Sequence, residues 1–483
     1  MVLKEKAING VLWNSLGNFT TLGIEFIVGI FLARILTPRE FGLIGTITVV
    51  IVLSEVMINS GFSQALVRKQ DCTQKDFSTV FFFNLLIGIL FFIILFFSAD
   101  ALSVIFKNKE LKPLIQVLGI GLIISAFTLI QSAKLIKRVD FKLQTKITLI
   151  SSILSGSVAI AMAFSGFGVW SLVVKSLLFK LCQSILLWVW NKWKPDFIFD
   201  KESFKQLFGF GSKLMLSGLI GTFFQNVYYL LIARYFTQQD LGYFTRAEMF
   251  KNLPSQNVTG IVTAVAYPIL ATLQNDRVQM KGVFRQMFVN TFFVTATLMC
   301  GMMAIAKALI ITLVGEKWIP SVILLQMLSV VGLMMPINSM NVNILNVVGR
   351  SDLYLKLQTL VQLLIIPNVF VGLYFGIKFL IVGMIFISFF GYIIFNHESK
   401  KVLNYPIKEQ IKDIFPSLLL ALTMGLLVFG VQLISHFSYQ VTLILQLALG
   451  FSIVVISGEF FKMKEYVFIK TTLLEKIQLL RSK

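Results

Sequence analysis

The sequence predicts an all-α integral membrane protein of about fourteen transmembrane helices, built as two six-helix bundles and two extra C-terminal helices. The first reason is composition: 57% of the 483 residues are hydrophobic and 14% are charged, whereas roughly a quarter of the residues in soluble domains are charged. The second is length, because the apolar runs repeatedly reach about twenty residues, enough to cross a bilayer. The third is that both halves of the chain carry the same ordered landmarks.

The apolar runs place the spans and the domains. In the first half, spans are expected at 14–36, 41–63, 77–98, 111–132, 147–165 and 168–190. In the second half they are expected at 212–233, 241–271, 284–311, 320–346, 354–376, 378–396, 415–435 and 441–460. The predicted domains are an N-lobe (1–190), a cytoplasmic linker (191–211), a C-lobe (212–396), a linker with two extra helices (397–460) and a basic amphipathic tail (461–483).

Basic residues account for the net charge of +20 and fall mainly in alternate short connections. They cluster at Lys4 and Lys6, around 68–75, 134–146, 192–205, 277–285, 350–356 and 400–412, and in the tail. Cytoplasmic loops retain positive charge, so this asymmetry predicts that both termini are cytoplasmic. Topology explains the excess without nucleic acid as a partner. The first span is expected to be retained, because it is long and lacks a small-residue cleavage site.

Enzyme chemistry is not expected from this composition. The three cysteines are isolated, and His397 and His436 lie in different loops, so neither a metal site nor a histidine acid–base centre is predicted. The longest predicted outer loop, around 100–112, carries no pair of acids suited to glycosyl transfer. We therefore expect a secondary transporter with no bound cofactor, able to draw on a proton or sodium gradient.

An internal repeat relates the halves. The segment from Phe31 to Gly42 matches the segment from Leu231 to Gly242, with Ala, Arg, Thr and Gly at one constant offset. A second echo relates 138–145 to 350–359. Because each half holds six predicted spans, the copies point the same way through the membrane, as in transporters with parallel repeats.

Three motifs carry a family resemblance. They are the LARILTPREFG turn ending at Gly42, the segment GFGVWSLV from Gly166, and LVGEKW ending at Trp318. With these motifs in this order and spacing, the chain resembles the Wzx-type polysaccharide flippases of the MATE-like multidrug/oligosaccharidyl-lipid/polysaccharide exporter superfamily. Within that group it most resembles exporters of colanic or teichuronic acid. The resemblance covers essentially the whole chain.

That resemblance implies a MATE-like fold and export of undecaprenyl-diphosphate-linked oligosaccharide repeat units across the bacterial inner membrane by alternating access. It also implies the lipid-linked oligosaccharide and the bilayer as partners, with polysaccharide polymerase and export proteins as further candidates. A cation-coupled multidrug extruder and a peptidoglycan-precursor (lipid II) flippase stay open as alternatives. Basic residues in the second half favour an anionic substrate over a cationic drug.

Acidic residues inside spans are candidates for ion coupling. Burying an ionisable group in a span costs about 2.5–3.5 kcal/mol, so such groups tend to face a cavity or a partner. Glu25 shares one helical face with Asn14 and Asn18, and Glu55 lies in the second span. Both carboxyls are candidates for proton or sodium coupling; the alternative is a paired or protonated glutamate that only joins helices.

Basic residues inside spans are candidates to bind an anionic diphosphate headgroup. The set is Lys175, Lys180, Arg246, Lys251 and the repeated Arg34 and Arg234. Five residues separate the two lysines, so they point about 140° apart and Lys180 is the better candidate for a central cavity. The alternative for the two repeated arginines is anchoring of helix ends. Gln225 and Asn226 are expected either to line a polar cavity or to join helices.

Overall fold

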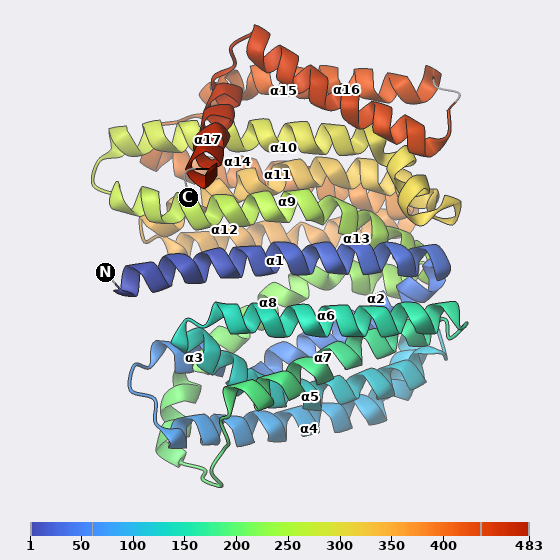
Figure 1. The fold of residues 1–483 in the computed structure, drawn as a ribbon, viewed down its shortest axis with the longest axis vertical. Helices are drawn as coiled ribbons and strands as arrows, with labels where there is room; N and C mark the ends of the chain where they lie inside the picture. The colour runs from blue at the N-terminus through green and yellow to red at the C-terminus, as the bar shows by residue number, and fades with distance from the viewer. Residues whose placement is uncertain (1, 60, 435–436, 482–483) are drawn as a thin grey trace. The chain divides into compact units, whose positions relative to one another are not determined.

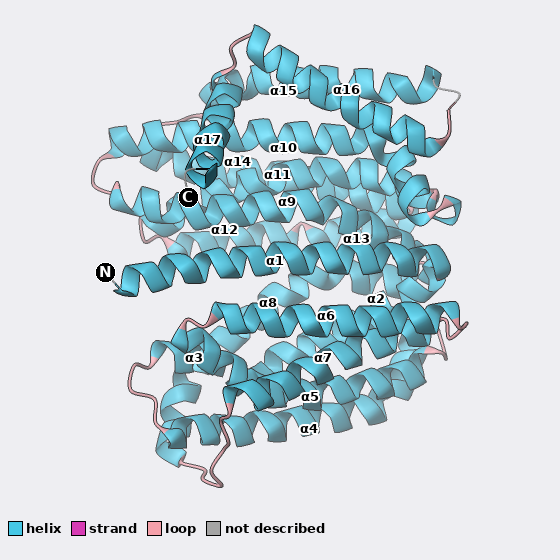
Figure 2. Cartoon of the chain, viewed as in Figure 1, coloured by secondary structure: helices cyan, strands magenta, loops and turns pink. Residues whose placement is uncertain are grey.

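The computed structural model describes the backbone of residues 2–59, 61–434 and 437–481. Side chains are described over the same ranges except at 2–12, 14–16, 473, 476, 477 and 479–481. Throughout these ranges the chain forms helices joined by short turns, with no strand (Figure 2). The predicted all-α class is confirmed.

The first compact unit comprises Met1–Gly242. Its helices are α1 (Val2–Ile35), α2 (Pro38–Asn59), α3 (Phe62–Arg68), α4 (Gln74–Ile105), α5 (Leu111–Arg138), α6 (Phe141–Phe164), α7 (Val169–Asn191), α8 (Lys201–Tyr235) and the start of α9 (Gln238–Thr272). Within this unit α1 packs on α6, α6 on α7, α7 on α5 and α5 on α4, while α2 packs on α8 and α5 (Figure 1).

The second compact unit comprises Tyr243–Lys483. It contains the rest of α9 and then α10 (Arg277–Val314), the 3-10 helix η1 (Glu316–Trp318), α11 (Pro320–Val347), α12 (Ser351–Leu363), α13 (Ile365–Phe375), α14 (Ile377–Leu403), α15 (Ile407–Ile434), α16 (Tyr439–Phe460) and α17 (Lys464–Arg481). Helix α10 packs against α11, α15 and α16. Its fully buried Phe284 and Phe288 belong to the unit's main apolar cluster.

The predicted spans correspond to helices in order. Thirteen segments of the described chain are long and apolar enough to cross a membrane. The predicted span 241–271 is the helix α9, but this segment is not among the thirteen because its sequence is less apolar and carries several charges. The loop predicted around 100–112 is shorter than expected, since α4 runs to Ile105 and α5 begins at Leu111. The predicted lobe boundaries stay a prediction.

Two predicted spans are broken. The span 41–63 ends as α2 and restarts as α3 after Gly61, whose φ of +68° lies in the left-handed region that glycine adopts without strain. The span 354–376 breaks between α12 and α13, three residues before Pro367. Proline lacks an N–H and clashes with the preceding turn, which explains a break there. Pro254, Pro268 and Pro336 instead lie inside continuous helices.

The repeated turns have the same local geometry. The N–H of Thr37 donates to Glu40 Oε2 (2.6 Å), and the N–H of Thr237 donates to Asp240 Oδ2 (3.1 Å). In each copy the acidic residue's own N–H donates back to the threonine Oγ1, so both turns are capping boxes.

The two turns also touch, because Gly42 lies against the carbonyl oxygen of Gln238 and Gly242 lies against that of Pro38. Neither contact leaves room for a Cβ atom. Within the first unit, the repeat therefore packs against itself reciprocally at this point.

The segment between α7 and α8, predicted as part of a linker, is hydrogen-bonded to the first turns of α4. Gln74 Nε2 donates to the Lys194 carbonyl (2.7 Å), and the N–H of Asp196 donates to Ser78 Oγ (2.9 Å). The N–H of Asp200 donates to Thr79 Oγ1 (3.0 Å). Hydrogen bonds from Ser203 hold the pKa of the Asp200 carboxyl below its usual value. The first part of this stretch is thus a fixed part of the first unit.

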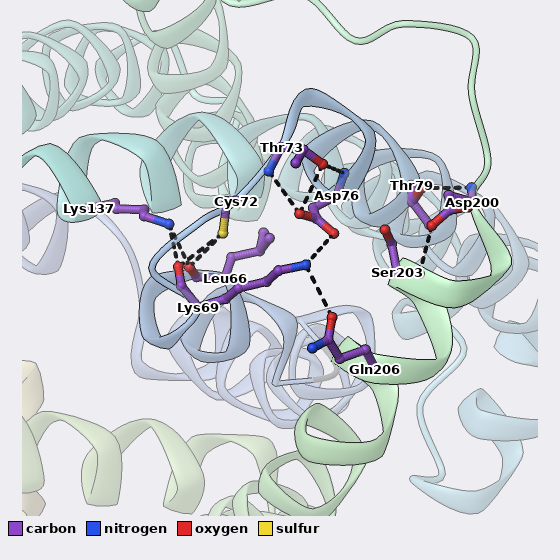
Figure 3. A network of polar contacts seen from close by, with 10 residues as sticks. All are labelled: Leu66, Lys69, Cys72, Thr73, Asp76, Thr79, Lys137, Asp200, Ser203 and Gln206. Carbon is purple, nitrogen blue, oxygen red and sulfur yellow. Dashed lines mark hydrogen bonds and ion pairs between the residues drawn. The ribbon is translucent and has the colours of Figure 1, made fainter.

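A polar network stabilises the turn between α3 and α4 in the same region (Figure 3). Lys69 Nζ lies 2.9 Å from Asp76 Oδ1 and also donates to Gln206 Oε1 on α8 (3.1 Å). Asp76 in turn accepts from the N–H of Thr73 (2.8 Å). The network therefore joins the end of α3, the start of α4 and the first part of α8.

Candidate functional site

An ion pair joins α1 to α7. Lys175 Nζ donates to Glu25 Oε2, which brings together two of the residues predicted from the sequence. The lysine side chain is 21% exposed and the glutamate side chain 35% exposed. Both groups lie in segments apolar enough to cross a membrane. Pairing offsets part of the cost of placing either charge there.

A second ion pair joins α2 to α7. Lys180 Nζ donates to Glu55 Oε1, and Ser125 Oγ on α5 donates to the same oxygen (3.2 Å). Gly121, one turn before Ser125, makes room for the lysine: a Cβ added there would lie 3.3 Å from Lys180 Nζ. The exposed fractions are 20% for Lys180 and 33% for Glu55, close to those of the first pair.

These pairs decide how the two lysines point. They diverge along α7, as the five-residue spacing predicted, and each reaches a different helix. The glutamates and the lysines were predicted as separate groups, with pairing as an alternative for the glutamates, but that they pair with one another one to one was not predicted. A signal was present, since the first half offers two acids and two lysines well inside the predicted spans, away from their ends. Which acid meets which lysine depends on packing between distant segments.

The arrangement permits charge exchange. In each partly exposed pair the lysine is neutralised by one carboxylate. A diphosphate carries more negative charge and more acceptor oxygens than that carboxylate. A lysine that turns to the diphosphate leaves its glutamate without a cation. An unpaired carboxylate in an apolar setting gains affinity for a proton or a metal cation. A link between anion binding and cation uptake at these pairs stays a prediction.

The second unit holds its predicted cations differently. Arg246 is 3% exposed, and its guanidinium lies 5.1 Å from the centre of the Trp318 ring. Lys251 is also 3% exposed, lies 3.5 Å from Glu248 Oε1 on the same helix and packs beside Gly332. Both side chains are buried, and a role of either in binding a headgroup stays a prediction.

The repeated arginines sit at helix ends. Arg34 lies in the last turn of α1 and is exposed. Arg234, in the last turn of α8, donates to the carbonyl of Ile105 at the end of α4, and its guanidinium lies 5.9 Å from the Tyr235 ring centre. The contact of Arg234 fits the anchoring alternative. Contact of either arginine with a substrate stays a prediction.

The predicted polar lining falls on α1 and α8. Asn18 and Gln225 are exposed, and Asn226 Nδ2 donates to the Thr222 carbonyl of its own helix (2.8 Å). The side chain of Asn14 lies outside the described residues. Whether these groups line a cavity stays a prediction.

The sequence motifs explain part of this geometry. In the first unit Gly168 of the second motif has φ +54°, and Glu40 Oε1 of the first motif lies beside it, where a Cβ would be 2.6 Å away. In the second unit Trp318 of the third motif is fully buried, and the guanidinium of Arg246 lies over its ring. The motifs thus hold helix ends together, and the paired charges lie elsewhere on the same helices.

Comparison with known sequences identifies relatives over the full length. The sequence model of a family described as polysaccharide biosynthesis protein matches residues 31–323. Teichuronic acid biosynthesis protein TuaB of Bacillus subtilis is 29% identical over 484 residues, covering 98% of this chain and 99% of TuaB. Lipopolysaccharide biosynthesis protein WzxC of Escherichia coli is 23% identical, covering 77% of this chain and 76% of WzxC.

Solved structures share the fold. The lipid II flippase MurJ in an inward closed conformation gives a TM-score of 0.77 at 17% identity, covering 94% of this chain and 99% of MurJ. An inward-facing MATE family multidrug resistance transporter gives a TM-score of 0.62 at 17% identity, covering 80% of this chain and 95% of that transporter. The predicted MATE-like fold of a multi-pass membrane protein is therefore confirmed.

Proposed function

Because this chain belongs to the polysaccharide biosynthesis protein family, we propose that it moves undecaprenyl-diphosphate-linked oligosaccharide repeat units across a bacterial inner membrane. The observation that carries the proposal is similarity over the whole chain to TuaB, a teichuronic acid biosynthesis protein. WzxC and the succinoglycan biosynthesis transport protein ExoT of Rhizobium meliloti, 26% identical over 306 residues, support the same class of substrate.

The chain acts in this proposal as a secondary transporter working by alternating access, with both termini in the cytoplasm. The substrate's diphosphate replaces Glu55 as the ion-pair partner of Lys180 and Glu25 as the partner of Lys175. Since each lysine is partly exposed and held by one carboxylate, a doubly charged group competes well for it. Release of the lipid on the other face lets each pair form again, which resets the protein.

Coupling follows from the same exchange. A glutamate that has lost its lysine favours a proton or a sodium ion, because an isolated carboxylate in an apolar segment is costly. Glu55 keeps the hydroxyl of Ser125 as a neighbour, which can donate to the carboxylate or accept from the protonated acid. The ion gradient then supplies the driving force.

The test in cells is deletion of the gene followed by analysis of lipid-linked oligosaccharides. The proposal expects the complete repeat unit to accumulate on the cytoplasmic leaflet, and the gene supplied on a plasmid to restore export. If deletion leaves surface polysaccharide unchanged and alters only drug sensitivity, the multidrug extruder alternative replaces the proposal.

A second candidate, a lipid II flippase, is favoured by one observation: the fold matches MurJ over 94% of this chain. Proteoliposomes loaded in parallel with lipid II and with an undecaprenyl-diphosphate-linked polysaccharide repeat unit separate the two. Faster movement of the repeat unit supports the proposal, and movement of lipid II alone overturns it.

A further inference from the structure

A cavity of about 560 Å³ lies between α15, α16 and the start of α17, in the second unit. Its volume is in the range of roughly 300–1,000 Å³ typical of small-molecule sites. Its lining includes Leu419, Leu420, Thr423, Phe461, Lys462 and Lys464. None of the residues of the first unit's two ion pairs lines it.

Helix α17 is docked in place beside this cavity. Tyr466 packs directly on Gly458 of α16, where no Cβ would fit. Lys470 pairs with Glu459, and Met463 is buried against Phe293 and Leu420. Figure 1 shows α17 lying crosswise to α10 and α15. A basic amphipathic helix that lies across the direction of the long apolar helices is typical of helices bound along a membrane surface.

The lining has two chemical parts. Leu419, Leu420 and Phe461 give an apolar wall. Lys462 and Lys464 are exposed and lie together where α16 turns into α17. An apolar wall next to paired ammonium groups complements an amphipathic anion rather than a free phosphate.

A neighbouring polar cavity of about 420 Å³ shares Lys464 and Glu465 with the first, and Gln286 and Asn290 of α10 also line it. Its lining also includes two carboxylates, Glu465 and Asp413, the second of which pairs with Arg285. Beyond the lysines, therefore, lie carboxylates that accept hydrogen bonds and amides that donate and accept them. A lipid headgroup that carries hydroxyls beyond its phosphate matches this arrangement, with the phosphate at the lysines and the hydroxyls at the carboxylates and amides.

We propose that these cavities bind one anionic phospholipid of the bilayer, of the phosphatidylglycerol type. The phosphate lies at Lys462 and Lys464, part of an acyl chain lies along Leu419 and Leu420, and the headgroup hydroxyls reach Glu465. Positive charge at an anionic leaflet supplies the electrostatic part of the affinity. The site serves to hold the end of α17 at the membrane, whatever substrate the protein moves.

The test is lipid binding to the purified full-length protein, measured by native mass spectrometry with added phosphatidylglycerol or phosphatidylcholine. The expected result is a clear preference for phosphatidylglycerol, weakened about fivefold by each of Lys462→Gln and Lys464→Gln, the ratio that corresponds to about 1 kcal/mol per basic residue at an anionic surface. Thr423→Phe, which narrows the cavity without changing charge, is expected to weaken binding as well.

The matched control is the double variant Lys408→Gln, Lys412→Gln, which removes the same charge from the first turns of α15 at exposed positions outside the cavity. This variant is expected to bind phosphatidylglycerol like the parent. Equal losses in this control and in the double variant Lys462→Gln, Lys464→Gln would reduce the effect to general surface charge and overturn the site. Equal binding of the two lipids, or full displacement by inorganic phosphate, would also overturn it.

Discussion

The two units of this protein hold four of the predicted headgroup-binding cations in different ways. In the first unit, Lys175 and Lys180 pair with glutamates on other helices, and both pairs are partly exposed. In the second unit, Arg246 and Lys251 are 3% exposed and are covered by packing, with Trp318 over the guanidinium. A charge held by one carboxylate at a partly open position can change partners, whereas one enclosed by packing serves the fold.

The largest effect expected from this comparison is in the second unit. Trp318→Ala removes a fully buried ring and uncovers Arg246, so we expect a loss of about 3–5 kcal/mol in the free energy of unfolding. The measurement is thermal unfolding in detergent. Trp170→Ala, at a ring that is 36% exposed in the first unit, is the control and should lose much less. Equal losses would mean that Trp318 is not a packing centre.

The two copies of the repeated turn pack closely against each other in the first unit, and a pair of glycine substitutions tests that contact. Gly42→Ala forces a Cβ against the Gln238 carbonyl, with an expected loss of about 1–3 kcal/mol typical of overpacking. Gly23→Ala in α1 meets no atom within 4 Å and should gain up to about 1 kcal/mol from helix propensity. Unfolding midpoints that shift the same way for both variants would contradict the contact.

The smallest effect is expected at the paired charges. Lys180→Met leaves Glu55 without its lysine at a half-buried position, so the expected loss is about 1–2 kcal/mol, between the values for exposed and buried pairs. Adding Glu55→Gln should recover most of that loss, because no charge is then left uncompensated. A double variant as unstable as the sum of the two single variants would show that the pair is not coupled.

Much of the fold was predictable because it is set by local pattern. Apolar runs about as long as a bilayer is thick place the helices, and the repeated turn signals two related halves. The break before Pro367 follows from proline chemistry, but Pro336 sits in a continuous helix, so a proline alone does not predict a break. The break at Gly61 was missed because glycine is also tolerated within helices.

The candidate site was only partly predictable. The residues were found because ionisable groups inside apolar runs are conspicuous, as with Glu25 and Lys180. Their pairing was missed because Glu55 and Lys180 lie 125 positions apart and meet only through the packing of α2 and α7. Burial of Arg246 by Trp318 depends equally on tertiary contacts.

The central claim is that the first unit's lysines leave their glutamates for the substrate's diphosphate. The most direct test is the rate at which the double variant Lys180→Met, Glu55→Gln moves a labelled undecaprenyl-diphosphate-linked repeat unit in proteoliposomes, alongside its unfolding midpoint. We predict parent-like stability with at least about a tenfold slower rate, equivalent to about 1.4 kcal/mol of lost interaction. Parent-like stability together with a parent-like rate would show that the pair only joins helices, and would contradict the claim.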